Sequence, residues 1–212
     1  MKLYTFFRSS AAFRVRIALN LKGLQYESVP KHFARNEHRA AEYLALNSQG
    51  LIPALAIDGV VLSQSLAIIE YLNDRHPEPP LLPTDPIDRA RVRSMALAIA
   101  CEIHPLNNLR VLNYLRGELQ QNDEGVGTWY RHWVSEGFAG LEPQAREYSA
   151  KGRYCFGDAI SLADVLLVPQ MYNARRFKTD LTSFPTLVGI STHLESLAAF
   201  AAARPEVQPD AQ

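Results

Sequence analysis

The sequence has few cysteines, no excess of charge of either sign and no long apolar run. Only Cys101 and Cys155 are cysteines among 212 residues, which excludes a disulfide framework and a clustered zinc site. The 22 basic and 22 acidic side chains cancel, so the broad positive field of nucleic-acid binders is missing. No segment approaches the roughly 20 apolar residues of a membrane span, and the N-terminus lacks the pattern of a signal peptide. We therefore expect a cytoplasmic protein that binds neither nucleic acid nor membrane, with both cysteines as buried fillers.

The composition otherwise describes a folded, globular chain. With 47% hydrophobic and 21% charged residues, it can bury a sizeable core and is too apolar to be disordered. A proline-rich stretch from His76 to Pro86 suits neither a helix nor a central strand, and so predicts a linker. We expect one domain over residues 1–83 and a second over residues 84–212.

The two parts differ in their apolar patterns. Before the linker, strand-like and helical runs alternate in the order β-α-β-α-β-β-α, and Asp58-Gly59 predicts a tight hairpin. This order favours a mixed sheet covered by helices. After the linker, helical spacing predicts an all-α domain with helices at about residues 87–119, 124–149, 161–176 and 191–203.

A serine and an aspartate three residues apart, Ser161 and Asp164, could suggest catalysis. They are instead typical of a helix start, with Ser161 as the N-cap and Asp164 at the third helical position. Ile160 and Val165 are placed to pack against each other around this start. We assign the cluster to folding.

The strongest chemical pattern is Arg8-Ser9-Ser10, where the first strand is expected to end and the first helix to begin. Hydroxyl groups there lie beside unpaired N–H groups and the positive end of a helix dipole, which stabilise an anion. The alternative is that Ser9 or Ser10 serves only as an N-cap.

Two more positions fit a binding groove. A cis Ile52-Pro53 bond would turn the preceding backbone outward to pair with an extended peptide ligand. Gln64-Ser65 opens a helix, where Ser65 would offer its hydroxyl and N–H to a carboxylate. Each could be an ordinary turn or cap, but together they indicate a peptide-binding groove.

Several separated motifs resemble the zeta class of the glutathione transferase superfamily, and within it the bacterial maleylacetoacetate and maleylpyruvate isomerases. They are FRSSAAFRVRIALNLKG, ALNSQGLIPAL, VLSQSLAIIEYL, EIHPLNNLRVLNYL and YCFGDAISLADVLLVPQMYNARRF, and they cover nearly the whole chain. The resemblance implies an α/β thioredoxin-like N-terminal domain and an all-α C-terminal domain, the glutathione transferase architecture. It also implies a glutathione site between the domains and a homodimer.

The resemblance also assigns roles to residues. It places the catalytic serine on Ser9, followed by Ser10, whereas Ala11 occupies the family's cysteine position, so a disulfide with glutathione there is excluded. Glutathione contacts are implied for Ser9, Ser10, His38, Ile52, Gln64, Ser65, Glu102, His104 and Asn108, and substrate-carboxylate contacts for Arg8, Arg110 and Arg176.

Helical spacing gives an independent test of part of this set. On a regular helix His104 and Asn108 lie within roughly 40° of each other, whereas Arg110 lies about 120° away. Pro105 can distort the helix and change where Arg110 points. The six histidines show no metal-ligand pattern, and we expect no metal.

These residues suggest a reaction. A glutathione thiolate, stabilised by a hydrogen bond from Ser9, would add to the cis double bond of a maleyl compound, permit rotation and leave the trans isomer. Arginines would hold the substrate's carboxylates. Maleylacetoacetate is the first expectation and maleylpyruvate the alternative. A general glutathione transferase and a non-catalytic scaffold that kept the fold remain rival hypotheses.

Overall fold

The structure is a computed structural model that describes residues 1–211. It divides into two compact units. The first holds Met1–Pro80 together with the segment from Ser196 onward, and the second holds Leu81–Glu195. The division after Pro80 lies close to the expected one, but the C-terminal segment, which we expected in the helical domain, belongs to the first unit.

The first unit contains the expected mixed sheet. Its strands are β1 (Lys2–Thr5), β2 (Glu27–Pro30), β3 (Ala54–Ile57) and β4 (Val60–Ser63), in the order β2-β1-β3-β4. β1 is parallel to β2 and antiparallel to β3, and β3 is antiparallel to β4. The predicted hairpin is confirmed, because Asp58 and Gly59 adopt φ angles of 49° and 79° between the paired residues Ile57 and Val60.

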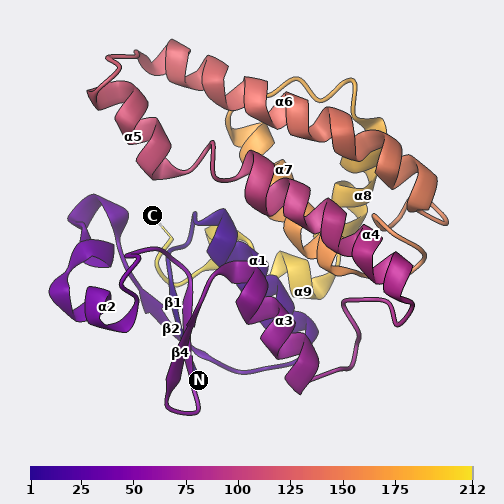
Figure 1. Ribbon diagram of the computed structural model, residues 1–212, viewed down its shortest axis with the longest axis horizontal. Coiled ribbons are helices and arrows are strands. Elements are labelled where there is room, and N and C mark those ends of the chain that lie inside the picture. Colours follow the sequence, from indigo (N-terminus) through magenta and orange to yellow (C-terminus); the bar gives the residue numbers. More distant parts are fainter. Residues whose placement is uncertain (212) are drawn as a thin grey trace. The chain divides into compact units, whose positions relative to one another are not determined.

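Helices cover both faces of this sheet, as Figure 1 shows. α1 (Ser10–Leu21) and α3 (Ser65–Arg75) pack together on one face. α2 (Ala41–Leu46) lies on the other face, after the short turns η1 (Phe33–Arg35) and η2 (Glu37–Arg39). Successive strand residues point to opposite faces. Buried Leu3 and Leu55 therefore pair across β1 and β3, whereas the Tyr4 ring lies 5.6 Å from that of Tyr43 in α2.

The C-terminal segment contains α9 (Ala198–Ala201) and η4 (Pro205–Val207), and long-range hydrogen bonds attach it to α1. Arg16 Nε donates to the carbonyl oxygen of Ala203 at 3.0 Å, and Asn20 Nδ2 donates to that of Ala199 at 2.9 Å. These pairs explain why the segment joins the first unit. The expected helix over residues 191–203 is wrong, because one helix ends at Glu195 and α9 follows separately.

The second unit is helical, as expected. It contains α4 (Pro86–Leu97), the π-helical η3 (Ala98–Ile103), α5 (Leu109–Gly117), α6 (Asp123–Tyr148), α7 (Leu162–Arg176) and α8 (Pro185–Glu195). The linker is confirmed, since no helix or strand lies between α3 and Pro86. Within residues 1–211, none of the helices combines the length and apolar character needed to cross a membrane.

The expected single helical segment over residues 87–119 is interrupted. α4 widens into η3, which ends at Ile103, and an irregular stretch follows until Asn108 caps α5. Pro105 lies in this stretch and has no N–H to continue a helical ladder. The angles expected for His104, Asn108 and Arg110 assumed a regular helix and are therefore wrong.

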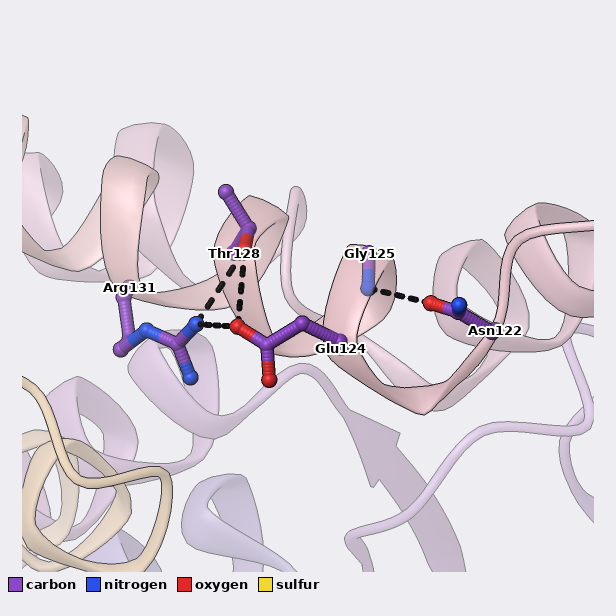
Figure 2. Close-up of polar contacts among 5 residues, drawn as sticks. All are labelled: Asn122, Glu124, Gly125, Thr128 and Arg131. Atoms are coloured by element: carbon purple, nitrogen blue, oxygen red, sulfur yellow. Dashed lines mark hydrogen bonds and ion pairs between the residues drawn. The ribbon is translucent and has the colours of Figure 1, made fainter.

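A polar network fixes the start of α6, as Figure 2 shows. Asn122 Oδ1 accepts a hydrogen bond from the Gly125 N–H at 2.9 Å, which caps the helix. Along the first two turns of the helix, Arg131 Nη2 lies 2.8 Å from Glu124 Oε1 and 3.1 Å from Thr128 Oγ1. These groups are largely exposed, so the network defines a helix end rather than a site.

The start of α7 confirms that Ser161 and Asp164 serve folding. Asp164 is fully buried, and its Oδ2 accepts from the N–H and the hydroxyl of Ser161 at 2.8 and 2.7 Å. Its Oδ1 accepts from the Cys155 N–H at 2.7 Å.

Burial raises the pKa of the Cys155 thiol well above its ordinary value. Cys155 is a buried filler as expected, but Cys101 is exposed, so that expectation is wrong for Cys101.

Candidate active site

Ser9 is the residue on which α1 begins. It has extended backbone angles, and its Oγ accepts a hydrogen bond from the Ala12 N–H at 3.2 Å. The N-cap interpretation is therefore correct for Ser9. It does not exclude chemistry, because capping uses a lone pair of the hydroxyl and leaves its hydrogen to be donated. Ser10 and Ala11 follow as buried residues of the first turn, so the family's cysteine position carries no thiol here.

Arg8 immediately precedes this cap. Its side chain is exposed, and its guanidinium carbon lies 4.9 Å from the centre of the Phe7 ring. Contact with an aromatic face orients a guanidinium without neutralising its charge. Arg8 can therefore present donors to an anion near the start of α1.

Ile52 offers backbone groups at the edge of a buried cluster. Its side chain is 8% exposed and packs with Ala12, Tyr43 and Ala54, and the Ile52-Pro53 bond is cis. Within residues 1–211 neither the N–H nor the carbonyl of Ile52 has a hydrogen-bond partner. Buried backbone groups are normally paired. This position therefore suits an extended peptide that supplies the missing partners.

The start of α3 carries the next expected residues. Gln64 is the N-cap but makes no capping hydrogen bond, and its Nε2 donates instead to Gln49 Oε1 at 2.8 Å. Ser65, the first residue of α3, is buried, and its Oγ accepts from Arg14 Nη1 at 3.4 Å. Arg14 is 1% exposed. An uncapped helix start, a hydroxyl and a buried guanidinium together favour a carboxylate.

His38 lies in η2, half-buried, with its ring centre 4.6 Å from that of Phe33. Phe33 in turn lies 5.0 Å from Phe6, so a line of rings connects His38 with the loop that carries Ser9. Burial lowers the pKa of His38, and the charge of Arg39 adds to this effect. The imidazole is therefore biased towards its neutral form.

The remaining expected residues belong to the second unit. Glu102 is exposed in η3, and His104 is half-buried at its C-terminal end. Asn108 caps α5 by accepting from the N–H of Arg110 at 3.1 Å, which makes these two residues neighbours. Arg176 is exposed at the end of α7, with its guanidinium 5.2 Å from the Phe177 ring. In the part of the chain that the structure describes, no hydrogen bond or ring contact joins Arg176 to Asn108 or Arg110.

Three residues near the site were not identified from the sequence: Arg14, which donates to Ser65, and the pair Arg16 and Asp210, which hold the backbone of Phe7. Arg14 and Arg16 stand inside an otherwise apolar helix, where a charged residue needs a partner. That signal could have found both arginines. Nothing local could have found Asp210. Within residues 1–211, no three His, Cys, Asp or Glu side chains gather as a metal site requires.

Comparison with known proteins identifies the family of the chain. The profile of the "Glutathione S-transferase, N-terminal domain" family matches residues 1–74. A "Probable maleylacetoacetate isomerase" of Vibrio cholerae is 51% identical over 99% of this chain and 97% of its own. A holo structure of a maleyl pyruvate isomerase, described as a bacterial zeta-class glutathione S-transferase, is 45% identical with a TM-score of 0.98 and covers both chains completely.

A third similar protein carries a ligand. The maleylacetoacetate isomerase of Anaeromyxobacter dehalogenans, crystallised with dicarboxyethyl glutathione and citrate in its active site, is 43% identical with a TM-score of 0.88. The match covers 100% of this chain and 97% of that one. Sequence identity of this level over the full length of both chains, with the same fold, shows that this chain and these proteins are homologous. The chain belongs to the zeta-class glutathione transferases, in the family of the maleylacetoacetate and maleylpyruvate isomerases.

Proposed function

We propose that the protein is a glutathione-dependent cis-trans isomerase that converts maleylacetoacetate to fumarylacetoacetate. The observation that carries this proposal is the start of α1, where the hydroxyl of Ser9 caps the helix and keeps a hydrogen to donate. Relatives that share nearly the full length of the chain bear the names of such isomerases. Maleylpyruvate is the alternative substrate, since both kinds of relative are similar at 45–51% identity.

Bound glutathione would supply a thiolate that adds to the cis double bond, allows rotation and then leaves. The task of Ser9 is to favour the thiolate by donating a hydrogen bond to sulfur, assisted by the positive end of α1. Lowering a thiol pKa by one unit requires about 1.4 kcal/mol of preferential stabilisation, which one such hydrogen bond can provide. Ser9 acts here as a donor and not as a base.

The first unit also has groups that suit the peptide. The unpaired backbone of Ile52 would receive the extended peptide through main-chain hydrogen bonds. Ser65 and the start of α3 would hold a carboxylate, with Arg14 donating a hydrogen bond to the Ser65 hydroxyl from behind. His38 and Gln64 are proposed as further contacts in this unit. Glu102, His104 and Asn108 are proposed glutathione contacts of the second unit.

Substrate carboxylates require cationic groups. Arg8 is exposed beside the start of α1, and an arginine can hold a carboxylate through two parallel hydrogen bonds. Arg110 and Arg176 are proposed to do the same from the second unit. A fixed substrate lets the thiolate act on a held double bond instead of in a bimolecular encounter.

We further propose that the protein is cytoplasmic and forms a homodimer.

The test is an ultraviolet assay of maleylacetoacetate and maleylpyruvate in parallel, with and without glutathione, together with a measurement of free glutathione. The proposal requires loss of the cis isomer only when glutathione is present, with the glutathione recovered. The substrate that is turned over faster shows whether the enzyme prefers maleylacetoacetate or maleylpyruvate. Glutathione consumed in proportion to product would instead indicate a general transferase, and no glutathione-dependent change would indicate a scaffold.

A further inference from the structure

The loop between β1 and α1 carries Ser9, and both backbone groups of Phe7 in this loop are held from outside it. The Phe7 N–H donates to Asp210 Oδ2 at 2.9 Å. The Phe7 carbonyl oxygen accepts from Arg16 Nη2, also at 2.9 Å. Phe7 is 6% exposed, so these partners replace water.

Ser9 is tied directly to this loop. The Ser9 N–H donates to the carbonyl oxygen of Phe6 at 2.9 Å, which closes a tight turn around Phe7 and Arg8. A displacement of Phe7 therefore moves the two residues that flank it and, through the turn, Ser9. The position of the Ser9 hydroxyl depends on how firmly Phe7 is held.

Asp210 is a suitable anchor for this purpose. It lies in the C-terminal segment, is 9% exposed, and accepts through a charged oxygen, which makes a stronger hydrogen bond than a neutral acceptor does. Arg16 is 1% exposed and, besides Phe7, it binds the end of β1 and the same segment: its Nη1 donates to Thr5 Oγ1 at 3.2 Å, and its Nε donates to the carbonyl oxygen of Ala203. A buried carboxylate and a buried guanidinium thus hold the N–H and the carbonyl of Phe7.

We propose that Asp210 is a positioning residue for the isomerase reaction, acting on Ser9 through the backbone of Phe7. The proposal rests on the proposed function, because it assumes that Ser9 donates to the glutathione sulfur. Removing the carboxylate releases the Phe7 N–H, loosens the turn and misaligns the Ser9 hydroxyl. The alternative is that Asp210 only fastens the C-terminal segment to the first unit, without influence on chemistry.

Two substitutions separate these readings. Asp210→Ala removes the acceptor, whereas Asp210→Asn keeps a carbonyl oxygen able to accept from the Phe7 N–H. Asn20→Ala is the matched control, because Asn20 also binds the C-terminal segment, at Ala199, but makes no contact with Phe7. If Asp210→Ala proves insoluble, Asp210→Glu replaces it, since the longer side chain keeps the charge but displaces the acceptor.

Three quantities are measured for each variant: kcat and KM with the maleyl substrate, the dissociation constant of glutathione, and the pKa of the bound thiol from its thiolate absorbance. For Asp210→Ala we expect kcat to fall about 10- to 100-fold, with glutathione affinity within about threefold of the unaltered protein. The thiol pKa should rise towards its free value of about 8.5. Asp210→Asn should restore most of kcat, and Asn20→Ala should lower thermal stability only.

The outcomes also distinguish this proposal from the proposed function. An unaltered protein without glutathione-dependent isomerisation overturns the proposed function itself. An active protein in which Asp210→Ala leaves the thiol pKa and kcat unchanged overturns only the positioning role. The same holds if Asn20→Ala reproduces the kinetic loss, because the effect would then come from general loosening of the segment. It also holds if Asp210→Asn is as impaired as Asp210→Ala.

Discussion

The hydroxyl oxygen of Ser9 lies 3.2 Å from the backbone nitrogen of Ala12 and accepts its hydrogen bond. A single side chain thus starts α1 and still has a hydrogen to offer to an anion. From the sequence, Ser9 could be either an N-cap or a donor to an anion. The structure shows that these two roles are compatible.

Ser9→Ala should therefore have two separable effects. Loss of the cap should lower the free energy of unfolding by about 1 kcal/mol. Loss of the donor should reduce isomerase kcat about 100-fold or more, by analogy with the removal of one oxyanion-hole donor. Asn122→Ala, which removes the cap of α6, should cost similar stability without the kinetic loss. Equal activity in the two variants would contradict the role of Ser9.

Substitution of Arg8 or Arg176 should affect substrate turnover and glutathione binding unequally. Arg8→Ala or Arg176→Ala should weaken turnover of maleyl substrates far more than binding of glutathione, because their proposed partners are substrate carboxylates. Turnover is measured by the ultraviolet assay and glutathione binding by calorimetry. Arg131→Ala, which alters the exposed network of Figure 2, serves as the control and should change neither quantity. Comparable losses of turnover and glutathione affinity would refute the assignment.

Much of the first unit could be predicted because its signals are local. The Asp58-Gly59 hairpin follows from residues that accept positive φ, and the start of α1 follows from a serine before an apolar helix. Ser65 was placed at a helix start for the same kind of reason. These features depend on a few neighbouring residues, so the sequence contains the information needed to identify them.

Other features could not be predicted because they depend on distant residues or on irregular backbone. Apolar periodicity continues across residues 98–108, where the structure has a π-helical stretch and a break at Pro105. The expected angle between His104 and Arg110 assumed one continuous helix, whereas Arg110 lies in the separate helix α5. The bond between Asp210 and Phe7 joins residues 203 positions apart. No local pattern indicates such a partner.

The packing of α6 gives a test that depends on a single methyl group. A Cβ at Gly137 would overlap the side chain of Ile103, so Gly137→Ala should destabilise the protein by about 1–3 kcal/mol despite the better helix propensity of alanine. Gly140→Ala in the same helix meets no atom within 4 Å and should be stabilising by up to about 1 kcal/mol. Urea unfolding measures both changes. Parallel changes in the two variants would show that propensity, and not packing, decides.

His38 predicts a pH dependence of stability. Burial and Arg39 lower its pKa in the folded protein, so the unfolded chain takes up a proton first as the pH falls. The stability that His38 contributes is complete above its unfolded pKa of about 6.5 and is lost as the pH falls through the lower, folded value. His38→Gln should make the free energy of unfolding less steep in this window. His76→Gln, an exposed control, should not remove the dependence.

The attachment of the last α-helical turn and its flanking residues to the first unit has a consequence for biosynthesis. A ribosome completes the sheet and α1 long before it adds residues 196–211, with all of Leu81–Glu195 in between. The turn around Phe7 therefore receives its carboxylate partner only after all of Leu81–Glu195 has been synthesised. The first unit therefore cannot complete its contacts until the second unit has been synthesised.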